Sequence, residues 1–387
     1  MLRSIIFWTH LCVGLVVGTV VFILCLTGAI LAFELQIITW AEHDARARPR
    51  QAGMELLSPA QIAAKVTPPP GEHIVSLEWS ADQDMPVRVL TDQRHVTLLN
   101  GYSGEILGPG AVGLRGFMRL ITELHVNLVL PLTGHWMVAI ANVGFVFLIM
   151  SGLWLWWPRQ WRWQSFRVAM TPRLMATGKA RDWNWHTTLG FWFLLPLFAI
   201  ATTGLVLSFA AADTWWRAFG GTHLFTAAAT PATKLDALPI PAASGSTWSQ
   251  GLHVIQERYP GWRSIMIGGN GTPNQDGVIS LNINHGTLRH RASVVQVKLD
   301  TRSGQLISER TWANDDGSTR ARAIARLGHT GEILGTWGQF WGFLACVAGC
   351  VIVYTGFALS WRRFFKTKKS VVEPAHPPLA SAADSSP

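Results

Sequence analysis

The stretch that decides the fold is Trp183-Asn184-Trp185-His186-Thr187-Thr188-Leu189-Gly190, which leads into an apolar run that reaches Thr203-Gly204-Leu205. It places a histidine at the start of a segment long enough to cross a bilayer as a helix. The same pattern occurs near the N-terminus. At an offset of 176 residues (His10 to His186), three features of the first helix recur without a gap: His10, Gly14 and Thr27-Gly28.

A second pair of segments repeats at an offset of 204 residues (His125 to His329). Further matches at this offset are Gly134 with Gly338, Gly152 with Gly356, Trp157 with Trp361, and Arg159 with Arg363. The two offsets predict a tandem duplication in which each half is a helix, an exported segment and a second helix. Corresponding helices then run in the same direction, so the pseudo-two-fold axis lies along the membrane normal.

Composition indicates a membrane protein: 49% of the 387 residues are hydrophobic and only 14% are charged. A helix needs about 20 apolar residues to span a bilayer. Four stretches without Asp, Glu, Lys or Arg reach that length, namely Ile5–Phe33, Leu132–Trp157, Trp185–Ala212 and Ile333–Trp361. The apolar part of the first stretch is too long for a signal peptide, and no small-residue cleavage site closes it, so a retained anchor is expected.

The net charge of +9 is better explained by membrane orientation than by nucleic-acid binding, because the basic residues are spread over every loop. The short loop 158–182 and the tail after Trp361 are strongly basic, and short basic segments stay in the cytoplasm. Both termini and the middle loop are therefore expected inside, with the two long loops outside. All four cysteines lie in the helices, so no disulfide framework is implied.

Each long loop contains the pattern of a small α+β module. In the first, Ser58-Pro59 is expected to start a short helix, strands alternate from His73 onward, and Asn100–Leu107 forms a turn that Asp300–Ile307 repeats. The predicted fold is membrane α-helical, with four transmembrane helices arranged as two tandem helix–module–helix repeats. The expected order is helix 1–38, module 39–131, helix 132–158, cytoplasmic loop 159–184, helix 185–212, module 213–332, helix 333–361 and disordered tail 362–387.

The histidines in the helices are the candidate functional residues. An ionisable side chain inside a membrane helix indicates function, although a single histidine more often forms an interhelical hydrogen bond. Four histidines in two repeat-related pairs favour ligation, because a two-fold axis brings His10 with His186, and His125 with His329, to equivalent positions. Imidazole is a common haem ligand. We therefore expect two haem b groups, one near each face of the membrane.

Two further assignments stay open at this stage. Gly14 and Gly190 lie one turn after His10 and His186, where they either leave room for a porphyrin or allow close helix packing. His125 lies 32 residues before Trp157, a helical length of ~48 Å that exceeds the membrane core. The chain must bend, and Pro131 is the expected place. His135 would then be a rival ligand.

Several of these segments resemble the PepSY-associated transmembrane proteins. The segments are the His-x3-Gly…Thr-Gly pattern of the first helix, Leu124-His125…Gly134, Ser151-Gly152-Leu153-Trp154-Leu155-Trp156-Trp157-Pro158-Arg159, and Gly328-His329-Thr330-Gly331-Glu332. The turns at Asn100 and Asp300 resemble those of PepSY modules. The resemblance covers nearly the whole chain. It implies an iron-regulated protein of the bacterial inner membrane, which in some members is a haem-containing ferric-siderophore reductase.

These observations lead to an expected function, electron transfer outward to a periplasmic ferric siderophore or another ferric chelate. The donor would be a membrane quinol or a separate cytoplasmic reductase. The alternative is a haem-free regulatory or transport subunit whose modules bind peptide or protein. No catalytic residue is assigned. Aromatic and basic residues near the outer ends of helices are candidates to hold the chelate: Trp215, Trp216, Arg217, Trp312, Arg320, Arg322 and Arg326.

Overall fold

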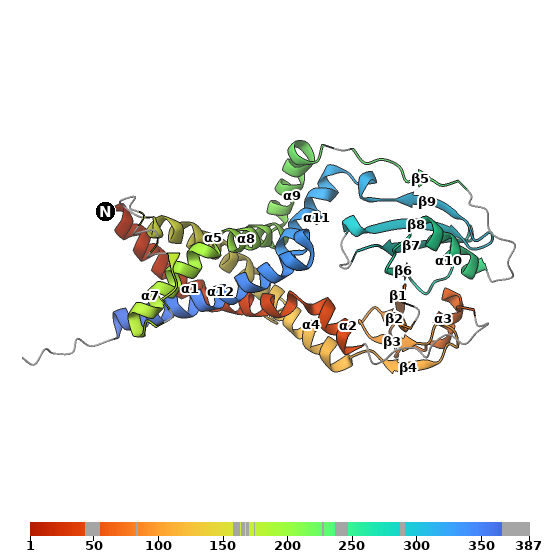
Figure 1. The fold of residues 1–387 in the computed structure, drawn as a ribbon, viewed down its shortest axis with the longest axis horizontal. Helices are drawn as coiled ribbons and strands as arrows, with labels where there is room; N and C mark the ends of the chain where they lie inside the picture. The colour runs from red at the N-terminus through yellow and green to blue at the C-terminus, as the bar shows by residue number, and fades with distance from the viewer. Residues whose placement is uncertain are drawn as a thin grey trace, which may run out of the picture.

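A bundle of long helices and a β-sheet lie end to end in the computed structural model (Figure 1). It describes residues 1–42, 55–82, 84–157, 163, 167, 170–173, 175–226, 228–236, 247–286 and 291–365. The N-terminus lies at the end of the bundle that is far from the sheet. Residues 158–162, 164–166, 168–169 and 174 of the predicted basic loop, the stretches 43–54 and 237–246 and the tail from 366 fall outside the described residues.

The predicted membrane spans are present. Three helices are long and apolar enough to cross a bilayer: α1 (Leu2–Leu31), α5 (Gly134–Trp156) and α12 (Gly335–Phe364). The helices α7 (Gly178–Trp192) and α8 (Leu194–Ser208) count as a fourth candidate span when they are taken together, with a bend of 68° between them. The sequence predicts one uninterrupted helix over 185–212, so the bend is a correction. Pro196 explains it, because its ring lacks an N–H and crowds the carbonyl of Trp192 one turn earlier.

The surface of the bundle is apolar. Val16, Leu195 and Trp337 are each at least 75% exposed. Inside the bundle the helices meet through small residues, including the fully buried Ala139 and Ala345. Large apolar side chains outside and small ones inside are typical of helices packed in lipid, where burial of apolar surface does not drive association. The helices therefore form a multi-pass membrane bundle.

Two pairs of short helices connect the bundle to the sheet (Figure 1). One pair is α2 (Glu34–Ala41) with α4 (Val112–Asn127), and the other is α9 (Ala210–Phe219) with α11 (Gly317–Thr330). The turn between α4 and α5 spans 128–133, so the break predicted at Pro131 is confirmed. The matching turn after α11 contains Gly331, whose φ of +77° suits glycine, and a Cβ there would meet the Gly338 carbonyl oxygen at 2.5 Å.

The two exported modules share one antiparallel sheet of nine strands in the order β4-β3-β2-β1-β6-β7-β8-β9-β5. The strands are β1 (Ile74–Ser80), β2 (Val87–Thr91), β3 (Val96–Leu99), β4 (Ile106–Pro109), β5 (Thr233–Lys234), β6 (Ser264–Gly268), β7 (Val278–Asn284), β8 (Val294–Asp300) and β9 (Leu306–Arg310). The modules join where β1 pairs with β6 over five residue pairs, from Ser76 with Gly268 to Ser80 with Ser264.

One hydrophobic core serves both modules. It includes residues of α3 (Pro59–Lys65) and α10 (Thr247–Arg258), and the rings of Trp79 and Trp248 lie 5.3 Å apart between centroids. The helix start predicted at Ser58-Pro59 is confirmed, since the Ser58 hydroxyl caps α3 by accepting from the Gln61 N–H. The sequence predicts two small modules but not that they form a single packed unit.

A buried ion pair connects the first module to the bundle. Glu42, with a side chain 2% exposed, accepts hydrogen bonds from Arg115 Nε at 2.7 Å and Nη2 at 2.9 Å, and Arg88 lies 3.3 Å away. Burial alone would raise the pKa of Glu42. The Arg115 hydrogen bonds and charge outweigh burial, so the pKa of Glu42 lies below the ordinary value.

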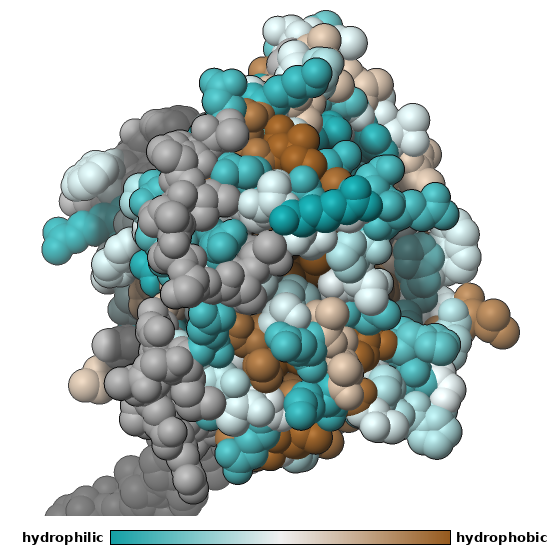
Figure 2. Space-filling model, turned by 90° about the vertical axis from the view of Figure 1, so that its right-hand side faces the viewer, coloured by the Kyte–Doolittle hydropathy of each residue, from teal (hydrophilic) through white to brown (hydrophobic). Residues whose placement is uncertain are grey.

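Figure 2 shows that the sheet end of the molecule is mostly hydrophilic.

Candidate functional site

The four predicted histidines lie at two levels of the bundle. His10 is on α1 and His186 is on α7, and these two form the inner level. His125 and His329 are on the short helices α4 and α11 near the sheet, and these two form the outer level. The levels can be measured along α1, because His125 contacts Thr27 of that helix. His10 and Thr27 are 17 residues apart in one unbroken helix. At 1.5 Å per residue the two levels are about 25 Å apart, most of the thickness of a hydrocarbon core.

In the first half, hydroxyl groups hold the Nδ1 atoms of the histidines. His10 Nδ1 lies 2.8 Å from Ser151 Oγ, and the Ser151 hydroxyl itself donates to the Phe147 carbonyl at 2.6 Å. His125 Nδ1 lies 2.8 Å from Thr27 Oγ1, and that hydroxyl donates to the Ile23 carbonyl at 2.7 Å. A hydroxyl has one proton to donate. Both oxygens therefore accept a hydrogen bond from a protonated Nδ1.

In the second half, backbone carbonyls accept the hydrogen bonds from Nδ1. His186 Nδ1 donates to the Ile352 carbonyl at 2.9 Å, and His329 Nδ1 donates to the Ile200 carbonyl at 3.0 Å. Thr355 and Thr203 provide nearby hydroxyl oxygens at 3.2 and 3.5 Å. A carbonyl can only accept, so these two Nδ1 atoms also carry a proton.

The tautomer of all four rings follows from these partners. With Nδ1 protonated in a neutral imidazole, Nε2 carries the lone pair. This is how a histidine that binds a metal is usually held: one nitrogen donates to the protein and fixes the ring, and the other faces the ligand. Each of the four histidines therefore has an unprotonated Nε2.

A glycine adjoins every one of these rings. A Cβ built on Gly152 would lie 3.5 Å from His10 Cε1, and one on Gly356 would lie 3.3 Å from His186 Cε1. At the outer level the corresponding distances are 3.4 Å for Gly28 and His125, and 3.2 Å for Gly204 and His329. Each histidine thus packs on a dipeptide in which a hydroxyl residue precedes a glycine: Ser151-Gly152, Thr355-Gly356, Thr27-Gly28 and Thr203-Gly204.

These dipeptides are functional positions that the sequence reasoning missed. The sequence reasoning uses several of these residues to align the repeats but assigns them no functional role. The signal was available, because a hydroxyl residue followed by glycine recurs at the two repeat offsets, Thr27-Gly28 with Thr203-Gly204 and Ser151-Gly152 with Thr355-Gly356.

The outer pair has the spacing of two ligands on one metal. The ring centroids of His125 and His329 are 6.1 Å apart, with an angle of 59° between the planes. A metal–imidazole bond is about 2 Å long, so two ring nitrogens on opposite sides of one metal lie about 4 Å apart. Each ring centre lies roughly 1 Å further from the metal than its nitrogen, so the two centroids lie about 6 Å apart. At the inner level His10 and His186 lie close enough for positive charges on the two rings to repel each other.

The other predicted site residues lie as follows. His135 is exposed on α5 and its ring contacts Trp136, so the structure brings His125 and not its rival to His329. A Cβ on Gly190 would meet nothing within 4 Å, and one on Gly14 would meet Leu148 Cδ2 at 3.7 Å. Neither glycine is at a close helix contact, which leaves space beside the inner pair. Among the described residues no three His, Cys, Asp or Glu side chains gather as a metal cluster.

Three residues of the predicted aromatic and basic patch connect α9 to α11. Trp216 donates to the Ala321 carbonyl at 2.6 Å, Arg217 donates to Ser318 at 2.9 Å, and Arg322 pairs with Asp213. A polar cavity of about 400 Å³ lies elsewhere, between the 92–94 turn and α4, the helix that carries His125. Its lining includes Arg94, Arg119 and Glu123. The sequence reasoning did not identify this cavity.

An ion-pair cluster positions the inner end of α7 against α12. Asp182 is fully buried and pairs with Arg181 at 2.9 Å and with Arg362 of α12 at 2.8 Å. It lies one turn before His186, whose Nδ1 partner Ile352 belongs to α12. The cluster therefore holds the two helices in the register that this hydrogen bond requires.

Comparison with known protein families gives one match, in which the family described as the PepSY-associated TM region matches residues 7–363. That range contains all four histidines and both sheet-containing modules. A comparison with curated proteins finds no match.

Proposed function

The chain belongs to the PepSY-associated TM family, and from this premise we propose that it is a haem b protein that moves electrons across a membrane. In this proposal the chain is a tandem repeat in a bacterial inner membrane, with both termini in the cytoplasm. His10 and His186 are the axial ligands of an inner haem, and His125 and His329 are those of an outer haem.

One observation carries the proposal. All four histidines donate from Nδ1 to the protein, which leaves four Nε2 lone pairs in two pairs about 25 Å apart along the bundle. Two opposed imidazoles are the axial set of a haem iron, and the spacing of His125 and His329 suits one iron between them. The space beside Gly190 supports a planar group at the inner level.

The chain's own residues determine how such a group behaves. Haem supplies reversible one-electron chemistry when bound. The partners of Nδ1 hold each ring in one orientation and make its free nitrogen a stronger donor, which stabilises the oxidised state and lowers the potential. The apolar bundle excludes water from the rings, whereas the outer pair lies beside the hydrophilic sheet end. Electrons then have a route from the inner level to an acceptor outside.

The acceptor in this proposal is a ferric siderophore or a similar chelate. The cavity between the 92–94 turn and α4 supports a site next to the outer level, because its lining places the guanidinium groups of Arg94 and Arg119 beside the helix of His125, together with the carboxylates of Asp92 and Glu123. The guanidinium groups can pair with anionic oxygen atoms of an iron complex. Reduction of the bound iron weakens its chelation and releases it.

An absorption spectrum of the purified protein tests the haem assignment. After expression with ample haem, we expect haem b bands and two haems per chain. His10→Ala or His186→Ala should remove one haem and leave the outer one, and His125→Ala or His329→Ala should do the reverse, while His135→Ala should change nothing. A featureless spectrum would end the haem proposal and favour the haem-free regulatory or transport subunit.

The acceptor is tested separately. Protein reduced chemically without oxygen is mixed with ferric siderophores, and reoxidation of the haem is followed by absorbance. Arg94→Ser/Arg119→Ser should slow reoxidation by an anionic chelate more than reoxidation by a neutral one. If reduced haem persists with every chelate tried but a quinone reoxidises it, electrons flow to the membrane pool and iron is not the acceptor.

A further inference from the structure

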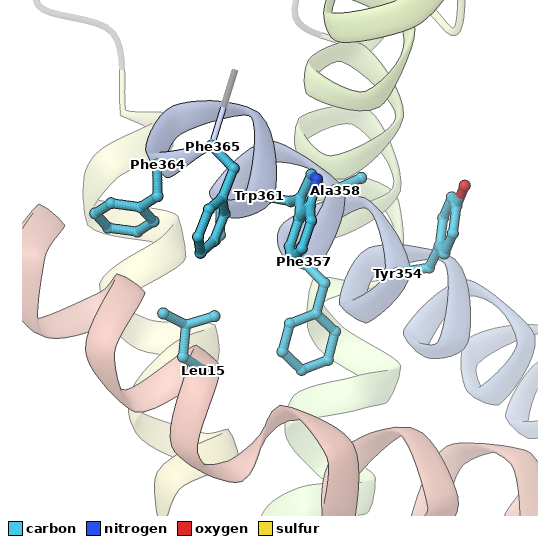
Figure 3. A pocket seen from close by; sticks show the side chains of 8 residues that line it. Leu15, Tyr354, Phe357, Ala358, Trp361, Phe364 and Phe365 are labelled. Carbon is cyan, nitrogen blue, oxygen red and sulfur yellow. The ribbon is translucent and has the colours of Figure 1, made fainter. Parts of the chain in front are cut away.

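An apolar cavity of about 560 Å³ opens between α1 and α12, at the end of the bundle far from the sheet. Figure 3 shows the rings of Phe357, Trp361 and Phe365 extending from α12 toward Leu15 of α1. Trp361 and Phe365 are 4.4 Å apart between centroids. The volume is in the range of pockets that hold small organic ligands.

The corresponding place in the other half of the bundle is filled. At the two offsets in the sequence, Leu15 matches Phe191 and Ser360 matches Trp156. Trp156 and Phe191 stack there with centroids 4.4 Å apart and planes inclined by 19°. A third lining residue, Ala358, matches the larger Trp154. The cavity exists because three positions carry small or flexible side chains where the other half carries aromatic ones.

The filled half shows what this geometry accepts, which is a flat aromatic ring in face-to-face contact. The open half is also reached from the lipid, since Trp361 and Phe365 are each 66% exposed and Leu15 is 41% exposed. The Ser360 hydroxyl is buried and donates to the Gly356 carbonyl at 2.8 Å, so the lining that the cavity exposes is apolar. Gly356 is the residue that touches the ring of His186, so α12 alone separates the cavity from that histidine.

We propose that this cavity binds the ring of a lipid-soluble isoprenoid quinol, the electron donor of the inner haem. The inference rests on the proposed function for the role of the quinol, whereas the site itself rests on the cavity. A quinol combines the flat ring that the aromatic lining accepts with an isoprenoid tail that can remain in the lipid.

The reaction balances with two haems. Oxidation of one quinol to the quinone breaks two O–H bonds and releases two protons and two electrons. Two ferric haems take up the electrons and become ferrous. The protons leave at the membrane face where the cavity lies, next to Arg362 and Arg363. A chain with two haems therefore accepts the full yield of one quinol.

The test transfers the filled half's side chains into the open half. Leu15→Phe/Ser360→Trp recreates the stacked pair, and Ala358→Trp narrows the cavity from its lipid side with less risk to folding. Trp156→Ser is the matched control in the other half. Each protein is placed in quinone-free lipid nanodiscs, and binding of decylubiquinone and of a short-chain menaquinone analogue is measured by equilibrium dialysis.

The unmodified protein should bind one quinone per chain saturably. Trp156→Ser should bind at least one, because it leaves the cavity intact and opens the corresponding place in the other half, and both filled variants should bind at least tenfold more weakly. Equal binding by all four proteins would overturn the proposal. So would non-saturable uptake, which would mean that lipid chains occupy the cavity. A photoreactive quinone gives a check without variants, because it must label the 354–365 peptide or the α1 peptide that contains Leu15, and labelling elsewhere refutes the site.

Haem measurements on the same samples separate the two proposals. If haem is present and dithionite reduces it, but quinone does not bind or filling the cavity has no effect, the quinol inference fails and the proposed function stands. If quinone binds saturably in the cavity but no haem is found, the proposed function fails and the site remains a quinone site. With both present, decylubiquinol should reduce the haem in the unmodified protein at least tenfold faster than in the filled variants.

Discussion

Removing the Ser151 hydroxyl beside His10 should change the midpoint potential of the inner haem more than removing the Thr355 hydroxyl beside His186. Ser151 is the Nδ1 partner of His10 within the described residues, at 2.8 Å. His186 has a carbonyl at 2.9 Å in addition to Thr355 at 3.2 Å. Ser151→Ala therefore deprives His10 of its orienting bond, whereas Thr355→Val leaves His186 bonded to Ile352.

The expected size follows from the value of one hydrogen bond. A neutral hydrogen bond contributes about 0.5–1.5 kcal/mol. If most of that contribution distinguishes the oxidised state from the reduced one, the midpoint potential rises by roughly 20–60 mV, since 59 mV corresponds to about 1.4 kcal/mol for one electron. The sign is upward, because a less basic imidazole stabilises the ferric state less. Thr355→Val should shift the potential by less than about 20 mV, the lower limit of this range.

A spectroscopic redox titration of each variant in nanodiscs measures these shifts. Haem content is determined first, so that lost haem is not mistaken for a changed potential. The outer haem serves as an internal standard, since its ligands are untouched. Equal shifts in the two variants, a larger shift in Thr355→Val, or a fall in potential would refute the assignment of Ser151 as the group that orients His10.

Three further predictions concern packing and stability. Gly204→Ala should reduce outer haem occupancy, because its Cβ would lie 2.7 Å from Asn142 Nδ2 and 3.2 Å from His329 Cε1. The control for haem content is Gly113→Ala, at an exposed position of α4 where a Cβ would meet nothing within 4 Å. Glu42→Gln should destabilise the first module by about 1–3 kcal/mol at neutral pH, measured by denaturant unfolding. The folded pKa of Glu42 is lowered, so its contribution to the free energy of unfolding is present above its ordinary pKa of about 4.3 and is lost as pH falls through the folded pKa. Glu42→Gln should therefore lack this acid dependence. Ile267→Ala, at the joint between the modules, should cost about 2–5 kcal/mol and lower a single unfolding transition of the whole sheet, whereas two separate transitions would contradict the shared core.

The sequence by itself determined the membrane spans, the candidate histidines and most elements of the modules. These are local properties. A run of apolar residues predicts a helix in lipid wherever it occurs, and the Ser58 cap and the turns at Asn100 and Asp300 depend only on neighbouring residues. The break after α4 was predictable too, since a span longer than the membrane must bend. The bend before Pro196 had a visible cause but was not predicted.

Only the tertiary structure decided which residues surround the histidines and how the modules combine. His10 meets Ser151 across 141 positions of sequence, and β1 meets β6 across nearly 200. Such contacts depend on the angle and register at which helices and strand edges pack, which no single segment encodes. The same holds for the cavity beside Leu15, because it results from three side chains that are smaller than their counterparts in a nearly repeated arrangement.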